Sequence, residues 1–568
     1  MTSDPWWRSA VVYQVYPRSF ADGDGDGIGD LAGLRSRLDH LQDLGVGVLW
    51  LSPVYPSPMD DNGYDICDYQ GIEPVFGTLA DFDALLEDLH GRGIRLVMDL
   101  VVNHTSDQHP WFVASRSSTD DPKRDWYWWR PAREGMEPGA PGAEPTNWSS
   151  AFSGPAWELD PATGEYYLHL FSRTQPDLDW EHPEVRQAVY AMMRWWLDRG
   201  VDGFRMDVIN FISKDTSLPD AHSSTGALHV DGSEHYASGP RIHEFLQEMH
   251  REVFAGRERV CLTVGEMPGV TVADARRFTD PARREVDMVF QFEHVALDQG
   301  VDKWDARPLD LRDLKASLGR WQAGLADVGW NSLYWNNHDQ PRVVSRFGDD
   351  GAFRVESAKM LATVLHLHRG TPYVYQGEEI GMANAPFAGI EDFRDIESVN
   401  RYAHTAGAGL ADPQEVLAAL RARSRDNART PMQWDDSPGA GFTAGHPWLP
   451  VNPDHVEVNV AAQRDDPDSV LAHYRRLIAL RREEPVVVDG DFEMLLPQDE
   501  RVYAFVRTLG GTSLLVLGNF SGEQAAAPVP DADEWARAEL LVGRAGAPGT
   551  DGDPIVLAPW EGRVYRRA

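Results

Sequence analysis

Charged residues follow an apolar stretch in the segment 200–211, which reads GVDGFRMDVINF. Arg205 and Asp207 are separated by one residue, so in a strand both side chains lie on the same face. A charge on a mostly apolar strand is costly unless it is paired or has a chemical task. A neighbouring cation lowers the pKa of a carboxyl group, so this spacing predicts that Arg205 keeps Asp207 ionised, as a nucleophile requires.

Polar residues also follow other apolar stretches of the chain. They are Asp99 and His104 after one stretch, Glu266 after a second, and His338 with Asp339 after a third. Cleavage of a glycosidic bond needs a carboxylic acid that protonates the leaving oxygen and a carboxylate that attacks the sugar or activates water. Glu266 has no cation beside it in sequence, and burial near other carboxylates would keep it protonated. The pattern therefore predicts a site for glycoside cleavage.

Eight short and almost continuously apolar stretches are predicted to be buried strands. Amphipathic helices separate many of them, and the clearest helix spans 183–199, with a proline near its start and a glycine after its end. Eight strands with helical connections favour a (β/α)₈ barrel, in which the active site lies at the carboxyl ends of the strands. The stretches are AVVYQVYPRSF (10–20), GVGVLWLSPVY (45–55), IRLVMDLVVNH (94–104), VDGFRMDVIN (201–210), RVCLTVGEM (259–267), VDMVFQFEH (286–294), NSLYWNNHD (331–339) and TPYVYQGEE (371–379).

The predicted fold class is α/β, with a barrel in two segments and two additions. Residues 1–102 and 174–486 form the catalytic barrel, and a long segment rich in Trp, Pro and Gly, 103–173, forms a subdomain inserted after the third strand. A further insertion lies near 383–430. Short alternating stretches such as RVYAFVRTL predict an antiparallel β-sandwich domain over 487–568.

Composition narrows the range of partners. The formal net charge is −36, which disfavours binding to nucleic acids or anionic membranes. Cys67 and Cys261 form no disulfide framework, the first twenty residues lack the pattern of a signal peptide, and no apolar run reaches the ~18 residues of a membrane span. We expect a cytoplasmic monomer whose partner is a small oligosaccharide substrate.

Several motifs together resemble those of a known family. DLVVNH, GFRMDVIN, VGEM and NNHDQPR are similar to the four signature regions of the α-amylase family, glycoside hydrolase family 13, and QPDLDW is similar to its fifth region. The likeness covers nearly the whole chain and is greatest to the subgroup of oligo-1,6-glucosidases (isomaltases) and dextran glucosidases. Asp179 stands where the fifth region usually has Asn, a departure that affects local loop contacts.

The resemblance implies a role for individual residues. Asp207 would be the nucleophile, Glu266 the acid/base, and Asp339 the residue that holds sugar hydroxyls and stabilises the transition state. Asp61 and Arg429 would close the far end of the pocket as an ion pair, so that one glucose is removed at a time. The implied substrate-binding residues are Asp61, Tyr64, His104, Phe152, Gln175, Arg205, Val208, His338 and Arg429.

The implied activity is that of a retaining, exo-acting α-glucosidase that hydrolyses α-1,6-linked glucose from isomaltose and short isomalto-oligosaccharides. Val208 supports the linkage, because α-1,6-specific members resemble this chain in carrying Val after the nucleophile. The alternatives are an enzyme that prefers α-1,4 links, a transglucosylase or sucrose isomerase, and a non-catalytic relative. FEHVALDQG lacks the Arg- and Asp-rich clamp of sucrose isomerases, and an intact carboxylate set argues against a non-catalytic relative.

DGDGDGIGD, residues 22–30, has the spacing of a loop that binds a hard cation. It begins like an EF-hand, but the twelfth position is Gly33, which cannot supply the bidentate carboxylate. The family carries a calcium or magnesium loop at this place, so we expect structural Ca²⁺ or Mg²⁺ and no organic cofactor. The expected ligands are Asp22, Asp24, Asp26, the Ile28 carbonyl and Asp30.

Overall fold

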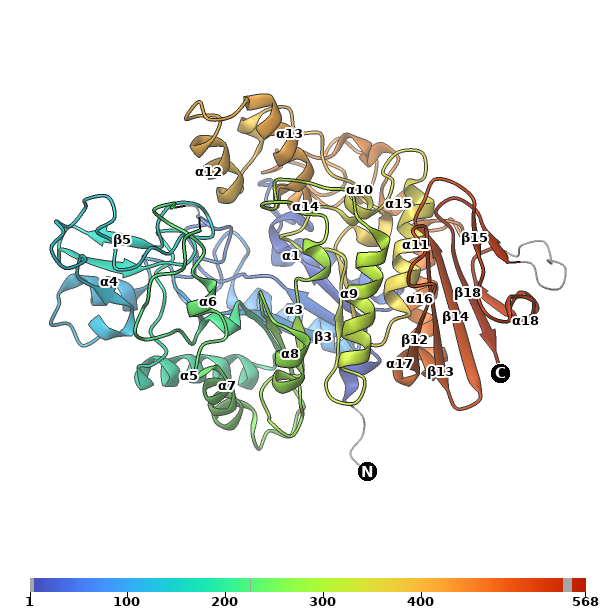
Figure 1. The fold of residues 1–568 in the computed structure, drawn as a ribbon, viewed down its shortest axis with the longest axis horizontal. Helices are drawn as coiled ribbons and strands as arrows, with labels where there is room; N and C mark the ends of the chain where they lie inside the picture. The colour runs from blue at the N-terminus through green and yellow to red at the C-terminus, as the bar shows by residue number, and fades with distance from the viewer. Residues whose placement is uncertain (1–4, 225, 545–553) are drawn as a thin grey trace.

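The protein is described by a computed structural model, which covers residues 5–224, 226–544 and 554–568. Its centre is a sheet of eight parallel strands in the order β10-β11-β1-β2-β3-β7-β8-β9, and a parallel bridge between Val289 and Asn331 joins its two edges (Figure 1). Each strand lies within one of the eight predicted stretches, so the barrel is confirmed. The strands are β1 (Val12–Val15), β2 (Val48–Leu51), β3 (Arg95–Val101), β7 (Gly203–Asp207), β8 (Leu262–Glu266), β9 (Met288–Phe290), β10 (Ser332–Leu333) and β11 (Thr371–Tyr375).

Helices cover the outside of the barrel. The helix predicted over 183–199 is α5 (Pro183–Arg199); His182 caps its first turn, and Gly200 ends it with a φ of 118° that favours glycine. Its buried face packs on the apolar core around the strands. The other main helices are α1 (Leu31–Ser36), α2 (Leu38–Leu44), α3 (Leu79–Gly91), α7 (Ile242–Met249), α8 (Val272–Phe278), α9 (Leu311–Gly324), α11 (Arg354–His366) and α16 (Val470–Glu483).

The segment between β3 and β7 forms a small subdomain at one end of the molecule (Figure 1). It begins with α4 (Pro110–Ser117) and contains an antiparallel sheet in the order β4-β6-β5, made of β4 (Trp129–Arg130), β5 (Trp157–Asp160) and β6 (Glu165–Leu168). Trp128, Trp148 and Trp157 are buried together in its core. These tryptophans therefore act as packing residues rather than as an exposed platform for sugars.

Two further units follow the eighth strand. One contains α12 (Ile396–His404), α13 (Pro413–Arg423) and the short α14 (Asp426–Arg429). The other lies at the opposite end of the molecule from the subdomain and is an antiparallel sheet in the order β12-β13-β14-β18-β16, with a second pair β15-β17 (Figure 1). Its strands are β12 (Asp491–Leu495), β13 (Val502–Leu509), β14 (Thr512–Asn519), β15 (Ala525–Ala527), β16 (Glu539–Val542), β17 (Ile555–Leu557) and β18 (Gly562–Arg567).

The described residues include no helix that is long and apolar enough to cross a membrane. Cys67 and Cys261 are both free thiols. The remaining features of interest lie at the carboxyl ends of the barrel strands, where the sequence places its charged residues.

Candidate active site

One buried guanidinium joins the carboxyl groups at the ends of the barrel strands. Arg205 is 1% exposed, and its Nη1 lies 2.6 Å from Asp99 Oδ1 and 2.8 Å from Asp207 Oδ1. Its Nη2 lies 2.7 Å from Glu266 Oε2. Asp207 is the last residue of β7 and Glu266 the last residue of β8, so the two parallel strands bring both carboxyls to the same end of the barrel.

This arrangement changes the expected division of charge. Burial raises the pKa of both Asp207 and Glu266, and Arg205 opposes the rise in each case. The expectation that Arg205 serves Asp207 alone was wrong, because the same guanidinium contacts Glu266. Two interacting carboxyls that share one cation titrate as a pair, and burial favours retention of a proton on that pair. A site with one proton and one carboxylate has both species that glycoside cleavage requires.

Asp339 lies among cations and stays ionised. It follows β10 in the chain, and its Oδ1 accepts a hydrogen bond from Arg429 Nη2 at 2.7 Å and lies 3.3 Å from Arg425 Nη1. His338 Nε2 is 3.3 Å from Asp339 Oδ2. Burial alone would raise the pKa of Asp339, but His338, Arg425 and Arg429 outweigh burial and hold it far below its usual range.

The far end of the pocket is closed by a different arginine from the one expected. Asp61 Oδ1 accepts from Arg425 Nη2 at 2.9 Å, whereas Arg429 pairs with Asp339. Arg425 Nε also donates to the buried Asp395 at 2.7 Å. The sequence carries a signal for Arg425, since it precedes Arg429 by four residues in SRDNAR and therefore lies on the same side of a helical turn.

Aromatic rings form the apolar walls. The Tyr64 ring stacks on His338 with centroids 5.1 Å apart, and its hydroxyl donates to Asp99 at 3.2 Å. The Arg425 guanidinium lies 4.9 Å from the centroid of Phe152. Sequence reasoning missed Phe171, whose ring lies 5.8 Å from Phe152. These contacts unite residues of the barrel, the subdomain and the segment around α14.

His104 and Gln175 complete the group near Asp61. Gln175 Nε2 donates to Asp61 Oδ2 at 3.1 Å and lies 3.2 Å from His104 Nε2. Burial lowers the pKa of His104 to about 4, so the imidazole is neutral at neutral pH. The structure thus brings together the expected residues from both sides of the barrel opening, although no single element contains them.

Val208 connects the two central carboxyls through its backbone. It has φ 34° and ψ 40°, a left-handed conformation that is strained for a β-branched residue. This turn directs the Val208 N–H to Glu266 Oε2 at 3.1 Å. The side chain packs with Phe211 and Tyr236 in the core of the subdomain. Val208 is therefore fixed between the end of β7, the end of β8 and the subdomain.

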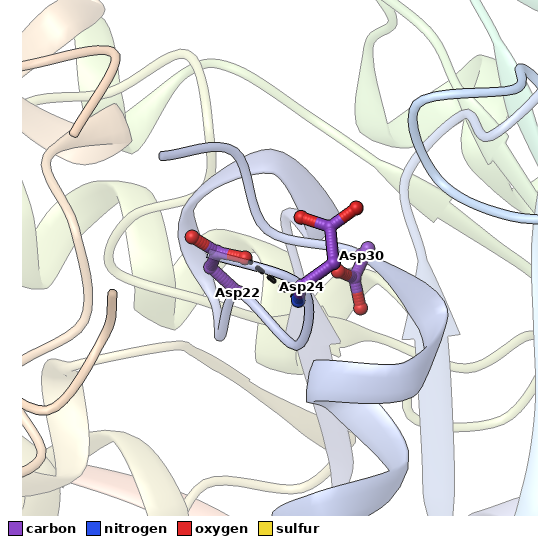
Figure 2. Close-up of side chains that lie close together, drawn as sticks. All are labelled: Asp22, Asp24 and Asp30. Carbon is purple, nitrogen blue, oxygen red and sulfur yellow. Dashed lines mark hydrogen bonds between the residues drawn. The ribbon is translucent and has the colours of Figure 1, made fainter. Parts of the chain in front are cut away.

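The acidic loop lies before α1, apart from these residues. Carboxylate oxygens of Asp22, Asp24 and Asp30 all lie within 4.8 Å of one another, and Figure 2 shows the three side chains. Asp26, an expected ligand, is not a member of this group; its Oδ1 accepts from the Ile28 N–H at 2.8 Å. Gly27 has a φ of 95°, and a Cβ there would meet the His446 carbonyl oxygen at 1.8 Å. The all-oxygen donor set fits a hard cation, with three carboxylates rather than four.

We predict that Asp61 is coupled energetically to Arg425 and not to Arg429. Burial raises the pKa of Asp61 to about 7, with Arg425 and Arg429 opposing, so the ionised form that pairs with arginine is favoured above that pH. Double-mutant cycles of unfolding in urea at pH 8, with Asp61→Asn, Arg425→Gln and Arg429→Gln, should give a coupling above about 0.5 kcal/mol for the first pair only. The coupling should fall at pH 6. Equal coupling to both arginines would contradict the assignment.

Comparison with known proteins agrees with this geometry. The model of the alpha amylase catalytic domain matches residues 14–490. The chain is 57% identical over 563 residues to an oligo-1,6-glucosidase of Parageobacillus thermoglucosidasius, with 99% of each chain covered. It superposes on the Bacillus licheniformis trehalose-6-phosphate hydrolase with a TM-score of 0.92, at 46% identity and coverage of 99% and 100%. A variant of the trehalulose synthase MutB gives a TM-score of 0.93, at 44% identity and the same coverage. The chain therefore belongs to the α-amylase family of glycoside hydrolases.

Proposed function

We propose that this enzyme is a retaining, exo-acting α-glucosidase that hydrolyses α-1,6-linked glucose at the non-reducing end of isomaltose and short isomalto-oligosaccharides. The observation that carries the proposal is the pair of Asp61 and Arg425, which closes one end of a site whose centre holds the carboxyls around Arg205. A closed end admits one terminal glucose and stops a longer chain. Similarity to oligo-1,6-glucosidases over almost the entire chain supports the substrate class.

The terminal glucose would be held by polar groups on one side and by rings on the other. Asp339, kept ionised by three neighbouring cations, suits a role as acceptor for sugar hydroxyls and as a stabiliser of positive charge at the anomeric carbon. Tyr64 and Phe152 supply apolar surface against the sugar ring. The substrate-binding set proposed here is Asp61, Tyr64, His104, Phe152, Gln175, Arg205, Val208, His338, Arg429 and the newly identified Arg425.

The chemistry follows from the single proton on the central pair. Asp207, as the carboxylate, attacks the anomeric carbon while Glu266 gives its proton to the leaving glycosidic oxygen, so the bond to the leaving sugar breaks and a glucosyl ester forms. Glu266, now ionised, takes a proton from a water that attacks the same carbon and releases Asp207. Two inversions give net retention of the α configuration. The reaction uses no organic cofactor.

We propose further that loop 22–30 binds structural Ca²⁺ or Mg²⁺ through Asp22, Asp24 and Asp30, with the Ile28 carbonyl and Asp26 as further oxygen donors. The three clustered carboxylates support the site. Asp22 also accepts from Thr443, and Asp22 N–H donates to the Phe442 carbonyl at 2.9 Å. A cation here would neutralise like charges where the start of the barrel meets a segment more than 400 residues later.

The enzyme is proposed to act as a cytoplasmic monomer. Two free thiols suit a reducing compartment. A net charge of −36 disfavours close approach of two copies and of anionic surfaces.

The proposed mechanism predicts the anomer of the first product. Proton NMR of isomaltose hydrolysis, recorded before mutarotation, should show α-glucose first, because the reaction proceeds by double displacement. Asp207→Ala and Glu266→Gln should each lower kcat by several orders of magnitude while circular dichroism stays native. Initial β-glucose would exclude Asp207 as the nucleophile.

Linkage preference is predicted to depend on Val208. A branched apolar side chain beside the nucleophile cannot hydrogen-bond the leaving sugar, whereas Thr has nearly the same shape and adds a hydroxyl. A pocket difference of this kind is worth roughly 10–200-fold in rate. We expect kcat/KM for isomaltose to exceed that for maltose by a ratio in this range, and Val208→Thr to reduce the ratio by improving maltose. A wild-type preference for maltose would refute the α-1,6 assignment and leave the glucosidase assignment intact.

Metal removal is predicted to affect stability more than catalysis. A cation that binds only the folded state raises its stability by mass action. Exhaustive chelation should therefore lower Tm by several degrees, with a smaller loss of initial rate, and Ca²⁺ or Mg²⁺ should restore Tm. Asp24→Asn should weaken the response to added metal. A Tm that does not change on chelation, with no metal found by elemental analysis, would rule out the site.

A further inference from the structure

Lys214 is a buried cation that none of the steps above uses. It lies seven residues after Asp207, and its side chain is 0% exposed. A buried ammonium is costly unless charge and hydrogen bonds compensate it. Its partners therefore identify what the lysine holds in place.

The three partners of Lys214 come from three separate segments. Nζ donates to the Phe211 carbonyl at 2.7 Å, in the turn that follows Asp207, and to Asn103 Oδ1 at 3.0 Å, just after β3. It also pairs with Asp177 Oδ2 at 2.9 Å, in the segment that returns from the subdomain. One ammonium thus ties the nucleophile's turn to the segments that carry His104 and Gln175.

The contact with Asn103 fixes the orientation of an amide. An ammonium only donates, so the oxygen of Asn103 must face Lys214 and the NH₂ group must face away. Asn103 Nδ2 then donates to Asp177 Oδ2 at 3.0 Å and lies 3.3 Å from His104 Nδ1. Since the NH₂ group cannot accept a hydrogen bond, His104 Nδ1 must offer its lone pair.

The other edge of the imidazole agrees with this tautomer. His104 Nε2 lies 3.1 Å from the Tyr64 carbonyl oxygen, which only accepts, so the single ring proton is on Nε2. This edge also faces Gln175, beside Asp61. His104 therefore presents an N–H at the closed end of the pocket, where the proposed glucose hydroxyls would lie.

We propose that Lys214 is a positioning residue that fixes the Nε2–H tautomer of His104 through Asn103 and holds the glucose-binding edge against the nucleophile's turn. The consequence for glucose binding rests on the proposed function, whereas the tautomer does not. Lys214 touches no reacting atom in this scheme. It acts only through the amide and the imidazole.

The chain offers a matched control for the loss of a buried lysine. Lys315 on α9 is 1% exposed and donates to three carbonyl oxygens, those of Leu496, Asp499 and Val502, beside the C-terminal sheet. Lys315→Met and Lys214→Met each remove a buried ammonium with three partners. Only the second change lies next to the pocket, so the pair separates general destabilisation from positioning.

The first experiment measures the tautomer in the full-length enzyme labelled with ¹⁵N-histidine, with the His104 signal identified by its loss in His104→Gln. The wild type and Lys315→Met should show a protonated Nε2. Lys214→Met should mix the two tautomers. Asn103→Asp retains the acceptor for Lys214 but replaces the donor to His104, so it should move the proton to Nδ1 or protonate the ring. A wild-type signal in Asn103→Asp would overturn the proposal even if Lys214→Met does not fold.

The second experiment measures binding with isomaltose and 1-deoxynojirimycin, a glucose-shaped inhibitor, after titration of active sites. Loss of one well-oriented hydrogen bond is worth about tenfold. We expect Lys214→Met to raise KM and the inhibition constant about tenfold, with a smaller effect on kcat per active site, while Lys315→Met changes neither. Equal behaviour of the two lysine variants would overturn the proposal. Failure of the wild type to cleave isomaltose would instead reject the proposed function and leave the tautomer result standing.

Discussion

The site depends on one guanidinium that serves three buried carboxyls. Arg205 contacts Asp99, Asp207 and Glu266, each within 2.8 Å, from the interior of the barrel. A single cation cannot neutralise three anions in a medium of low dielectric, so the excess negative charge is relieved by holding a proton. The enzyme thus stores its acid and its nucleophile in one electrostatic unit. Removal of the arginine would alter both at once, which makes it a poor position for gradual evolutionary change.

A second charge cluster closes the pocket by the same principle, with the balance reversed. Arg425 and Arg429 face Asp61, Asp339 and Asp395, and the short helical turn α14 carries both guanidiniums to the same side. Here two cations are enough to keep Asp339 ionised. The difference between the clusters is the ratio of cations to carboxyls, and it yields a proton donor in one place and a permanent anion in the other.

The sequence was sufficient for the strands and insufficient for the pairing of charges. Parallel strands that are buried on both faces leave long apolar runs, so all eight could be found before the fold was known. Partner choice is different, because it depends on distances between segments far apart in the chain. Arg425 and Arg429 are equally good candidates in SRDNAR, and only the fold decides that Arg425 meets Asp61. The same holds for Glu266, whose cation is 61 residues away in sequence. Lys214 gave no signal, since an isolated lysine is normally read as a surface residue.

The pairing of β1 has a consequence for biosynthesis. Its neighbours are β2, close in sequence, and β11, whose Tyr373 lies opposite Val12. The barrel cannot close until the ribosome has made the chain past Tyr375, which at about 5–20 residues per second takes tens of seconds. Throughout that time the first strand presents an unpaired edge that other nascent chains can join. Stretches of the sequence that need no early partner, such as the acidic loop and α1, follow β1 directly and shield little of it. The cell must protect this open edge during synthesis, and a trigger-type holdase at the exit tunnel is the kind of helper that such a topology requires.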